Sequence, residues 1–400
     1  MEARALPSPL VVAGRYWRRL VPCLLVLALI AHDAGAHDPS SYGGVFRSRN
    51  LGANWLSADV GQFLNAALIV AINPKDQAHL LAGTDLGLIG SRNAGLSWKP
   101  EARDLIYGAV FAVTFLDDGQ GAICAAQNGV FRFAAGHWLR SLAPDAALPA
   151  KTLVTSRSGH RVYLLGRNRL FVSTDAGESF APAPTPSPAS EITALTIVRS
   201  EPELILAVID GRVMANPEGS QQWRTRGLGQ ESEPVDIVAA DPHVARRIWA
   251  AQAGRIHVSD DLGEAWRRVG RPLPEPSTLV RGIAANGEVT TLLVSTNRGL
   301  YRSETGGETW ALKEDNLPIH LEAGPLARDP GEAGLIYAVY SLMPYAEVWR
   351  LANEGGSLIK RLDPISLVGG VALWLLILLA GAWLARRLAH GRAATRGDLK

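Results

Sequence analysis

One short motif recurs along this sequence at nearly constant intervals, and this regularity constrains the fold more than any other feature. Its pattern is Ser, any residue, Asp, Asn or Thr, any residue, Gly, two further residues, and Trp or Phe. Five clear copies occur, and weaker echoes at residues 133–138, 215–223 and 351–358 fill the gaps between them. The glycines of these eight segments follow one another every 41 to 48 residues. Such a period is typical of repeat proteins, in which each repeat is one supersecondary unit.

Each position of the motif has a physical role in a tight turn between two strands. Glycine reaches the positive φ angles that such a turn needs, and the Ser hydroxyl and the following Asp or Asn side chain accept hydrogen bonds from turn amides. The closing aromatic ring buries a large apolar surface. We therefore expect the motif residues to be structural rather than catalytic. They are Ser48, Asn50, Gly52, Trp55, Ser91, Asn93, Gly95, Trp98, Ser173, Asp175, Gly177, Phe180, Ser259, Asp261, Gly263, Trp266, Ser303, Thr305, Gly307 and Trp310.

The segments between the motifs predict short strands. In the first full repeat, apolar runs at residues 66–72, 79–82, 86–90 and 96–99 are separated by Asn-Pro, Gly-Thr-Asp and Asn-Ala-Gly turns. Helical periodicity is not evident between residues 40 and 360. The pattern predicts four strands per repeat, with the innermost strands of the other repeats near Val110, Leu153, Ile192, Val235, Val280 and His320.

Seven four-stranded units of this length predict an all-β fold, a seven-bladed β-propeller. Because an open ring would leave strand edges exposed, we expect the N-terminal hairpin at residues 44–58 to complete the last blade beside strands near residues 321–343. A degenerate hairpin at residues 348–360 would then form a stalk. The alternative is an eighth, partial blade.

The repeats resemble the Asp-box, or BNR, repeats of sialidases, of sortilin-type receptors and of propellers related to the photosystem II assembly and stability factor. The resemblance rests on the five motifs and extends over the repeat region. It implies that the boxes lie on outer turns of the blades, away from the central channel where members of these families bind ligands. It implies little about activity, because many unrelated functions share this scaffold.

The N-terminus predicts export from the cytoplasm. Arg15, Arg18 and Arg19 precede an apolar run at residues 20–31, which is followed by an Ala-Gly-Ala triplet. A basic segment, an apolar segment and small residues in this order are typical of a secretory signal peptide, here residues 1–36. An uncleaved N-terminal anchor is the alternative.

The C-terminus predicts a membrane anchor. Residues 365–385 carry no charge and are long enough to cross a bilayer, which places a transmembrane helix at residues 362–385. Five Arg and Lys residues against a single Asp mark the tail, residues 386–400, as cytoplasmic. We therefore expect a single-pass protein of the cytoplasmic membrane, with the propeller of residues 37–361 on the periplasmic side.

Composition argues against several classes of partner and cofactor. A formal charge of +2 does not suggest nucleic acid. The nine histidines lack metal-binding spacing and Cys124 is the single cysteine of the mature chain, so the sequence predicts no metal and no other cofactor. Arg246, Arg247 and the Arg-rich turn at residues 266–271 leave two interpretations, a basic patch for an acidic partner or an evenly charged surface.

A sialidase would need an arginine cluster, a Tyr nucleophile with a Glu partner and an Asp as acid and base. Tyr337, Tyr340 or Tyr345 could supply the nucleophile by position, but Tyr is an ordinary strand residue. The Arg-Ile-Pro signature of that family is missing at residues 42–48, which read YGGVFRS. No catalytic residue is therefore predicted.

Three predicted inner strands, at residues 67–73, 109–115 and 192–198, are apolar and place almost no acid toward the channel. A rigid disc with variable loops is suited to holding another protein or a polymer. We therefore expect a non-enzymatic module that binds another protein at a propeller face or in the membrane, in an assembly or scaffold role. A sialidase-like glycoside hydrolase, or a surface protein that binds a glycan, is the alternative.

Overall fold

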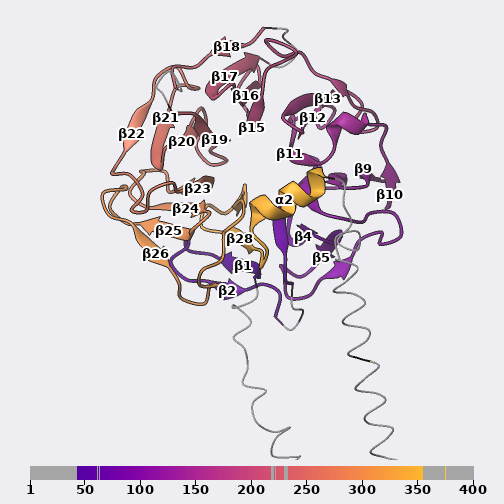
Figure 1. The fold of residues 1–400 in the computed structure, drawn as a ribbon, viewed down its shortest axis with the longest axis horizontal. Helices are drawn as coiled ribbons and strands as arrows, with labels where there is room; N and C mark the ends of the chain where they lie inside the picture. The colour runs from indigo at the N-terminus through magenta and orange to yellow at the C-terminus, as the bar shows by residue number, and fades with distance from the viewer. Residues whose placement is uncertain are drawn as a thin grey trace, which may run out of the picture. The chain divides into compact units, whose positions relative to one another are not determined.

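The structure, a computed structural model, describes residues 43–60, 62, 64–217, 220, 222–228, 233–354 and 374. Within these residues, seven four-stranded antiparallel sheets are arranged as blades around a common axis (Figure 1). The short apolar runs between glycine-containing turns therefore form strands at the intervals that the repeat predicts. The prediction of an all-β, seven-bladed propeller with four strands per blade is confirmed.

Six blades consist of four strands that are consecutive in sequence, numbered here from the innermost strand outward. Blades 1 to 3 are β3 (Ala67–Asn73), β4 (Asp76–Thr84), β5 (Leu88–Ser91) and β6 (Lys99–Pro100); β7 (Val110–Phe115), β8 (Ala122–Ala126), β9 (Gly129–Ala134) and β10 (His137–Arg140); and β11 (Ala150–Thr155), β12 (Val162–Gly166), β13 (Arg169–Ser173) and β14 (Ala181–Pro182). Blades 4 to 6 are β15 (Ile192–Val198), β16 (Leu204–Ile209), β17 (Arg212–Pro217) and β18 (Arg224–Thr225); β19 (Val235–Ala240), β20 (Ile248–Gln252), β21 (Arg255–Ser259) and β22 (Arg267–Val269); and β23 (Val280–Ala285), β24 (Leu292–Thr296), β25 (Gly299–Ser303) and β26 (Ala311–Lys313). A short 3₁₀ helix, η2 (Asp145–Ala147), precedes β11.

Blade 7 closes the ring with strands from both ends of the propeller. Its order is β27 (Ala327–Arg328), β28 (Ile336–Tyr340), β1 (Gly44–Ser48) and β2 (Leu56–Ser57). Strands β1 and β28 pair along their whole length, from Gly44 opposite Tyr340 to Ser48 opposite Ile336. The predicted closure by the N-terminal hairpin is confirmed. The innermost strand is β27 rather than a strand near His320, because His320 lies in a turn with a φ of 68°.

A helix replaces part of the predicted C-terminal hairpin. Helix α2 (Tyr345–Asn353) covers residues expected in a strand and a turn, so that prediction is wrong as far as Asn353. The sequence supports a helix because Val348 and Ala352, four residues apart, are both buried. In addition, the negative charge of Glu347 in the first turn and the positive charge of Arg350 in the last turn interact favourably with the helix dipole. The predicted hairpin beyond residue 354 lies outside the described residues.

Buried apolar side chains gather between neighbouring blades. Seven clusters occur, and each combines residues of two adjacent blades, as Leu81 of blade 1 does with Phe131 of blade 2. Burying one such side chain stabilises the fold by about 1.5–3 kcal/mol. The ring is therefore held together mainly by contacts between blades.

The alternation of strand direction gives the propeller two different faces. Each innermost strand begins at one face, which we call the loop face, because the loops that join blades lie there. The third strand of a blade turns into the fourth at the opposite face, which we call the turn face. Helix α2 follows β28, the second strand of blade 7, and so begins at the loop face, near the centre of the ring (Figure 1).

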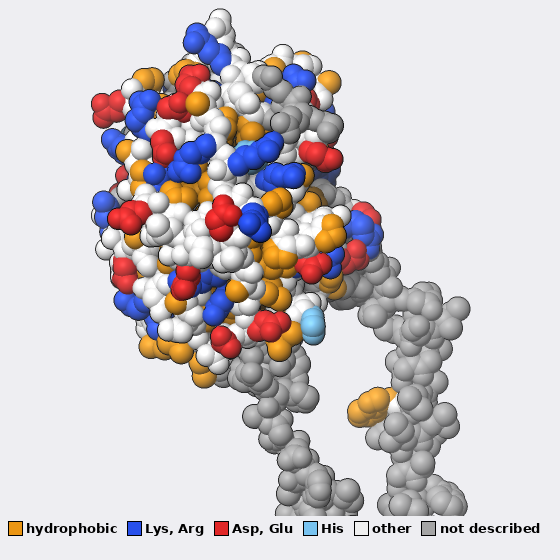
Figure 2. All heavy atoms as spheres, turned by 90° about the vertical axis from the view of Figure 1, so that its left-hand side faces the viewer, with side chains coloured by type: hydrophobic (Ala, Val, Ile, Leu, Met, Phe, Trp, Pro, Cys, Tyr) orange, Lys and Arg blue, Asp and Glu red, His pale blue; other side chains and the backbone are white. Residues whose placement is uncertain are grey.

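The rim of blade 5 carries charges of both signs. Figure 2 shows basic and acidic side chains interspersed on this side of the molecule rather than a basic field. Asp260 pairs with Arg247 at 2.6 Å and with Arg267 at 3.8 Å, and Arg271 pairs with Glu308 at 3.3 Å. The Arg-rich turn therefore belongs to a mixed surface.

The predicted ends of the chain fall almost entirely outside the described residues. The signal peptide, residues 1–36, and the tail, residues 386–400, are not described, and of the predicted membrane span only Trp374 is. Among the helices of the described ranges, none has the length and apolar character needed to cross a membrane.

Candidate functional site

The five motifs make the same turn between the third and fourth strands of a blade. In each copy the glycine N–H donates to the Ser hydroxyl at 2.7 to 2.9 Å. The N–H two residues after the glycine donates at 2.9 Å to the side chain at the third motif position. At Asp175 burial raises the pKa, but hydrogen bonds from Ser173 and Ser179 outweigh burial and lower it to about 2. The polar groups of the motif hold the turn itself.

Three of the four motif tryptophans also link their blade to the one before it, whereas the buried indole N–H of Trp55 has no hydrogen-bond partner among the described residues. The indole N–H of Trp98 in blade 1 donates to the carbonyl oxygen of Ala58 in blade 7 at 2.8 Å. Trp266 donates to Arg226 at 2.9 Å, and Trp310 donates to Arg271 at 3.1 Å, in each case in the preceding blade. The sequence predicted the burial of these rings but gave no sign of the hydrogen bond between blades.

A second repeated feature lies at the loop-face end of the axis. In the innermost strands of blades 1 to 6, the pairing with the next strand skips one residue near the strand's start. Such a bulge re-aims a side chain away from the regular alternation of a strand. The six skipped residues, which we call the bulge residues, are Leu68, Phe111, Lys151, Thr193, Asp236 and Arg281.

Two of the bulge residues are cationic, and the charge of one lowers the pKa of the other. Arg281 of blade 6 forms an ion pair with Glu322 at 2.7 Å and donates to the Ala323 carbonyl oxygen at 3.0 Å. Lys151 of blade 3 donates to the Thr193 carbonyl oxygen at 3.2 Å. Burial lowers the pKa of Lys151, and the charge of Arg281 lowers it further. Residues of blades 3 and 6 therefore face a shared region at the axis.

Asp236 is the acidic bulge residue. Burial, and to a lesser degree the charge of Glu233, raise its pKa to about 6. Its Oδ2 atom is buried without a hydrogen-bond partner, as is the hydroxyl of the neighbouring bulge residue Thr193. The three strands expected to be apolar, β3, β7 and β15, carry no acid at the bulge position, whereas β19 of blade 5 places a carboxyl group there.

Tyr345, the first residue of α2, lies among the bulge residues. Its ring meets the ring of Phe111 edge to face, with centroids 5.2 Å apart and planes at 76°. The guanidinium of Arg281 lies over the same ring, 5.0 Å from its centroid. The backbone N–H of Tyr345 donates to Oε2 of Glu322 at 3.1 Å. We call Phe111, Arg281 and Glu322 together the axial site, in which Tyr345 is bound.

The other two tyrosines considered for catalysis are core residues of β28. Tyr340 is fully buried, contacts Phe46 edge to face and has a hydroxyl without a partner. The Tyr337 ring is buried too, and its hydroxyl donates to the Ala94 carbonyl oxygen at 3.4 Å. Burial raises the pKa of all three tyrosines, so none is prepared to act as a phenolate.

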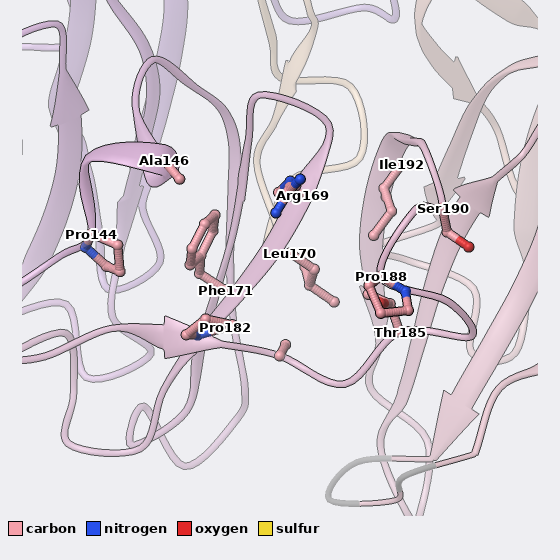
Figure 3. A pocket seen from close by; sticks show the side chains of 11 residues that line it. Pro144, Ala146, Arg169, Leu170, Phe171, Pro182, Thr185, Pro188, Ser190 and Ile192 are labelled. Carbon is pink, nitrogen blue, oxygen red and sulfur yellow. The ribbon is translucent and has the colours of Figure 1, made fainter.

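A pocket of about 410 Å³ lies between blades 3 and 4 at the loop face (Figure 3). The Pro-rich segment at residues 181–190 forms one wall of it. The exposed side chain of Arg169 stands at the start of β13, and the walls are otherwise mostly apolar. Figure 3 shows the lining side chains, which come from Pro144 and η2, from β13 and β14, from the Pro-rich loop and from Ile192 at the start of β15. The lining residues are Pro144, Ala146, Arg169, Leu170, Phe171, Pro182, Ala183, Thr185, Pro188, Ser190 and Ile192.

A buried ion pair lies at the turn-face ends of two inner strands. Arg328 of β27 lies 3.3 Å from Oδ2 of Asp241, and the two side chains are 7% and 1% exposed. Asp241 also accepts hydrogen bonds from the Trp249 indole at 2.9 Å and from the His243 N–H at 2.9 Å. Burial raises the pKa of Asp241, but the charge of Arg328 and these hydrogen bonds outweigh burial and lower it. This pair joins blades 5 and 7, and Arg328 also donates to the Ala285 carbonyl oxygen of blade 6 at 3.1 Å.

Metal binding has no geometric support in the described ranges. Their His, Cys, Asp and Glu side chains form no group of three or more that could hold an ion. Cys124 is fully buried in blade 2, and burial raises the pKa of its thiol, so it behaves as a core residue.

Similarity to known proteins is limited to the fold. No protein-family model matches the sequence, and no curated protein is similar enough in sequence to count as a relative. Among solved structures, YCF48 bound to a D1 peptide matches with a TM-score of 0.53 at 17% identity, over 75% of this chain and 96% of that chain. YCF48 from Cyanidioschyzon merolae matches with a TM-score of 0.51 at 14% identity, over 68% and 95% of the two chains. The propeller fold is supported, while the assignment of the repeats to the Asp-box class stays a prediction.

Proposed function

We propose that this chain is a non-enzymatic propeller, anchored in the cytoplasmic membrane with its blades on the periplasmic side, that binds another protein in an assembly or scaffold role. The anchor and the compartment rest on the sequence of the two ends. The choice of a protein partner is supported by a neighbour of the same fold, YCF48, that has been solved with a D1 peptide bound.

The observation that carries the proposal is the pocket between blades 3 and 4. A volume of about 410 Å³ suits one or two side chains of a polypeptide segment. Three prolines and Phe171 give it rigid apolar walls that lose little conformational entropy on binding, and Arg169 at its edge offers donors for a carbonyl or carboxylate. Mostly apolar walls with a few polar groups, here Arg169, Thr185 and Ser190, are typical of ligand-binding pockets, and a side chain of a partner segment is a ligand of suitable size.

The test is capture of the partner from the native membrane. Cells expressing the full tagged chain are cross-linked, and the complex is purified in mild detergent and identified by mass spectrometry. Thr185→Trp fills the pocket, whereas Pro186→Trp alters a residue of the same loop that does not line it. We expect one stoichiometric partner with the unaltered chain and with Pro186→Trp, and its loss with Thr185→Trp. A chain that is always recovered alone contradicts the proposal.

A second candidate, a sialidase-like hydrolase, is favoured by one observation: Tyr345, Glu322 and Arg281 converge at the axis. Three details oppose it. Glu322 contacts the backbone N–H of Tyr345 rather than its hydroxyl, burial raises the pKa of that hydroxyl, and Arg281 is already paired with Glu322. Release of methylumbelliferone from its sialoside by the purified chain, abolished by Tyr345→Phe, would establish this activity. We expect no release.

A further inference from the structure

Tyr345 is held by groups from three blades that read different parts of one residue. Phe111 of blade 2 contacts the ring edge to face, Arg281 of blade 6 lies over the ring face, and Glu322, which precedes β27 of blade 7, accepts the backbone N–H. Because Tyr345 is the first residue of α2, its N–H has no acceptor within the helix, and Glu322 supplies one. The axial site thus recognises an aromatic residue together with its main chain, as a peptide-binding site does.

The segment that carries Tyr345 is not needed to build any blade. In blades 1 to 6 the second strand continues directly into a hairpin to the third, but in blade 7 the third strand, β1, comes from the N-terminal end of the propeller. The N–H of Leu342 still donates to the Asn65 carbonyl oxygen at 2.8 Å. The described chain after Leu342 therefore does not pair as a strand in any blade. Tyr345, which belongs to this added segment, occupies the axial site.

The charges at the site favour an uncharged aromatic residue over an anion. The guanidinium of Arg281 is neutralised by Glu322, and the two side chains are only 14% and 24% exposed. A cation over a ring face is attracted by the ring quadrupole, and the attraction grows where water is excluded. Phe and neutral Tyr satisfy these conditions, whereas an acidic side chain would compete with Glu322 for Arg281.

The geometry points to a binding site for an aromatic residue of a partner polypeptide, which Tyr345 occupies as an internal competitor. The inference rests on the proposed function and names the chemistry of the partner: a segment with a Tyr or Phe whose backbone N–H reaches Glu322. Because a short tether holds a competitor at an effective concentration of the order of mM, an outside segment competes with Tyr345 at a disadvantage. The apparent affinity falls by the fraction of molecules in which the site is open.

The experiment measures binding of a labelled peptide to the full chain in detergent by fluorescence anisotropy. The probe is a copy of residues 341–348, Ser-Leu-Met-Pro-Tyr-Ala-Glu-Val, capped at both ends, and its control carries Ala in place of Tyr. We expect Tyr345→Ala to bind the Tyr peptide at least about tenfold more tightly than the unaltered chain, which corresponds to a site occupied by Tyr345 nine times in ten. Tyr345→Phe keeps the competitor and should bind like the unaltered chain, as should Tyr107→Ala, which removes an exposed tyrosine that is not part of the axial site.

The inference is overturned by equal peptide binding to Tyr345→Ala and the unaltered chain, or by equal binding of the Tyr and Ala peptides. Should Tyr345→Ala fail to fold, the unaltered chain provides the same test. A saturating amount of Tyr peptide should then speed hydrogen exchange at the amide of Tyr345, because displacement frees this N–H from Glu322. No change in exchange at saturation would contradict displacement.

The outcome separates this inference from the proposed function. Peptide binding without any captured protein would leave the axial site established and the proposed function refuted. A captured partner that is retained equally by the unaltered chain and Tyr345→Ala, with no peptide binding to either, would leave the function established and the axial site refuted.

Discussion

Replacing Arg328 by methionine tests whether the propeller depends on the ion pair at the turn-face ends of two inner strands. Methionine keeps most of the length of the side chain and removes the charge. Asp241, only 1% exposed, would then be left as a buried charge without its counter-ion. Breaking one side of a buried pair costs about 3–5 kcal/mol. Because Asp241 keeps its hydrogen bonds from Trp249 and His243, we expect the lower end, about 3 kcal/mol.

The assay is urea unfolding of the full chain in detergent, followed by tryptophan fluorescence, with the free energy of unfolding compared between variants. Arg267→Met is the matched control, because its pair with Asp260 is about half exposed and 3.8 Å long, and it should change stability by less than about 1 kcal/mol. Adding Asp241→Asn to Arg328→Met should recover part of the loss, since the amide oxygen still accepts from Trp249 and carries no charge.

The dependence on pH supplies a second check. In the intact pair the pKa of Asp241 is lowered, so its contribution to stability is present above the ordinary carboxyl pKa and is lost as the pH falls through the lowered value. Without Arg328 the burial of Asp241 raises that pKa instead, and protonation then relieves the unpaired charge. The stability gap between the two proteins should therefore narrow from pH 7 to pH 4. A loss below about 1 kcal/mol, or a gap that does not depend on Asp241, would refute the reasoning.

Three further changes test other contacts. Trp98→Phe should cost about 1 kcal/mol in urea unfolding, beyond the smaller loss from ring size, because it removes the hydrogen bond to Ala58; an unchanged midpoint would show that the bond is not used. Gly95→Ala should lower the melting temperature clearly more than Gly136→Ala, because both glycines have φ near 85° but only at Gly95 would a Cβ meet a backbone oxygen, at 2.8 Å. Equal losses would show that the positive φ alone, and not the contact, destabilises the variants. Asp236→Asn should stabilise the chain by up to about 2 kcal/mol at pH 8 and should have no such effect at pH 4. The reason is that the pKa of Asp236 is raised to about 6, so the folded state loses stability as this carboxyl group ionises. A gain in stability that does not depend on pH would contradict this.

The fold could be predicted from the sequence because the same turn motif is repeated along the chain. Every copy of the motif needs a glycine at positive φ and a Ser hydroxyl to receive its N–H, so the turn chemistry appears in the sequence at each blade. The same reasoning found the closure of the ring, because strand edges must be covered. It failed at α2, where a helix of nine residues follows the last strand and repeats nothing elsewhere in the chain.

The axial site was harder to predict because its positions repeat while its residue types do not. Each bulge residue follows the first residue of an innermost strand, and the types run from Leu68 and Phe111 to Lys151, Asp236 and Arg281. Aligning the repeats on the motif would have shown charged residues at this one position among apolar neighbours. Nothing in the sequence indicates that Tyr345 returns to the axis, since that contact depends on where β28 ends.

The pairing of β1 with β28 also means that blade 7 cannot form until nearly the whole propeller has been synthesised. Strand β1 is among the first parts of the propeller to be made, and its partner follows about 290 residues later, which at roughly 5–20 residues per second takes about 15–60 s. Throughout that interval Val45 and Phe46, fully buried in the finished ring, have no blade to enter. A chain that stops short of β28 therefore keeps an unpaired, apolar strand at its beginning, and quality-control proteases and chaperones have a long window in which to find it.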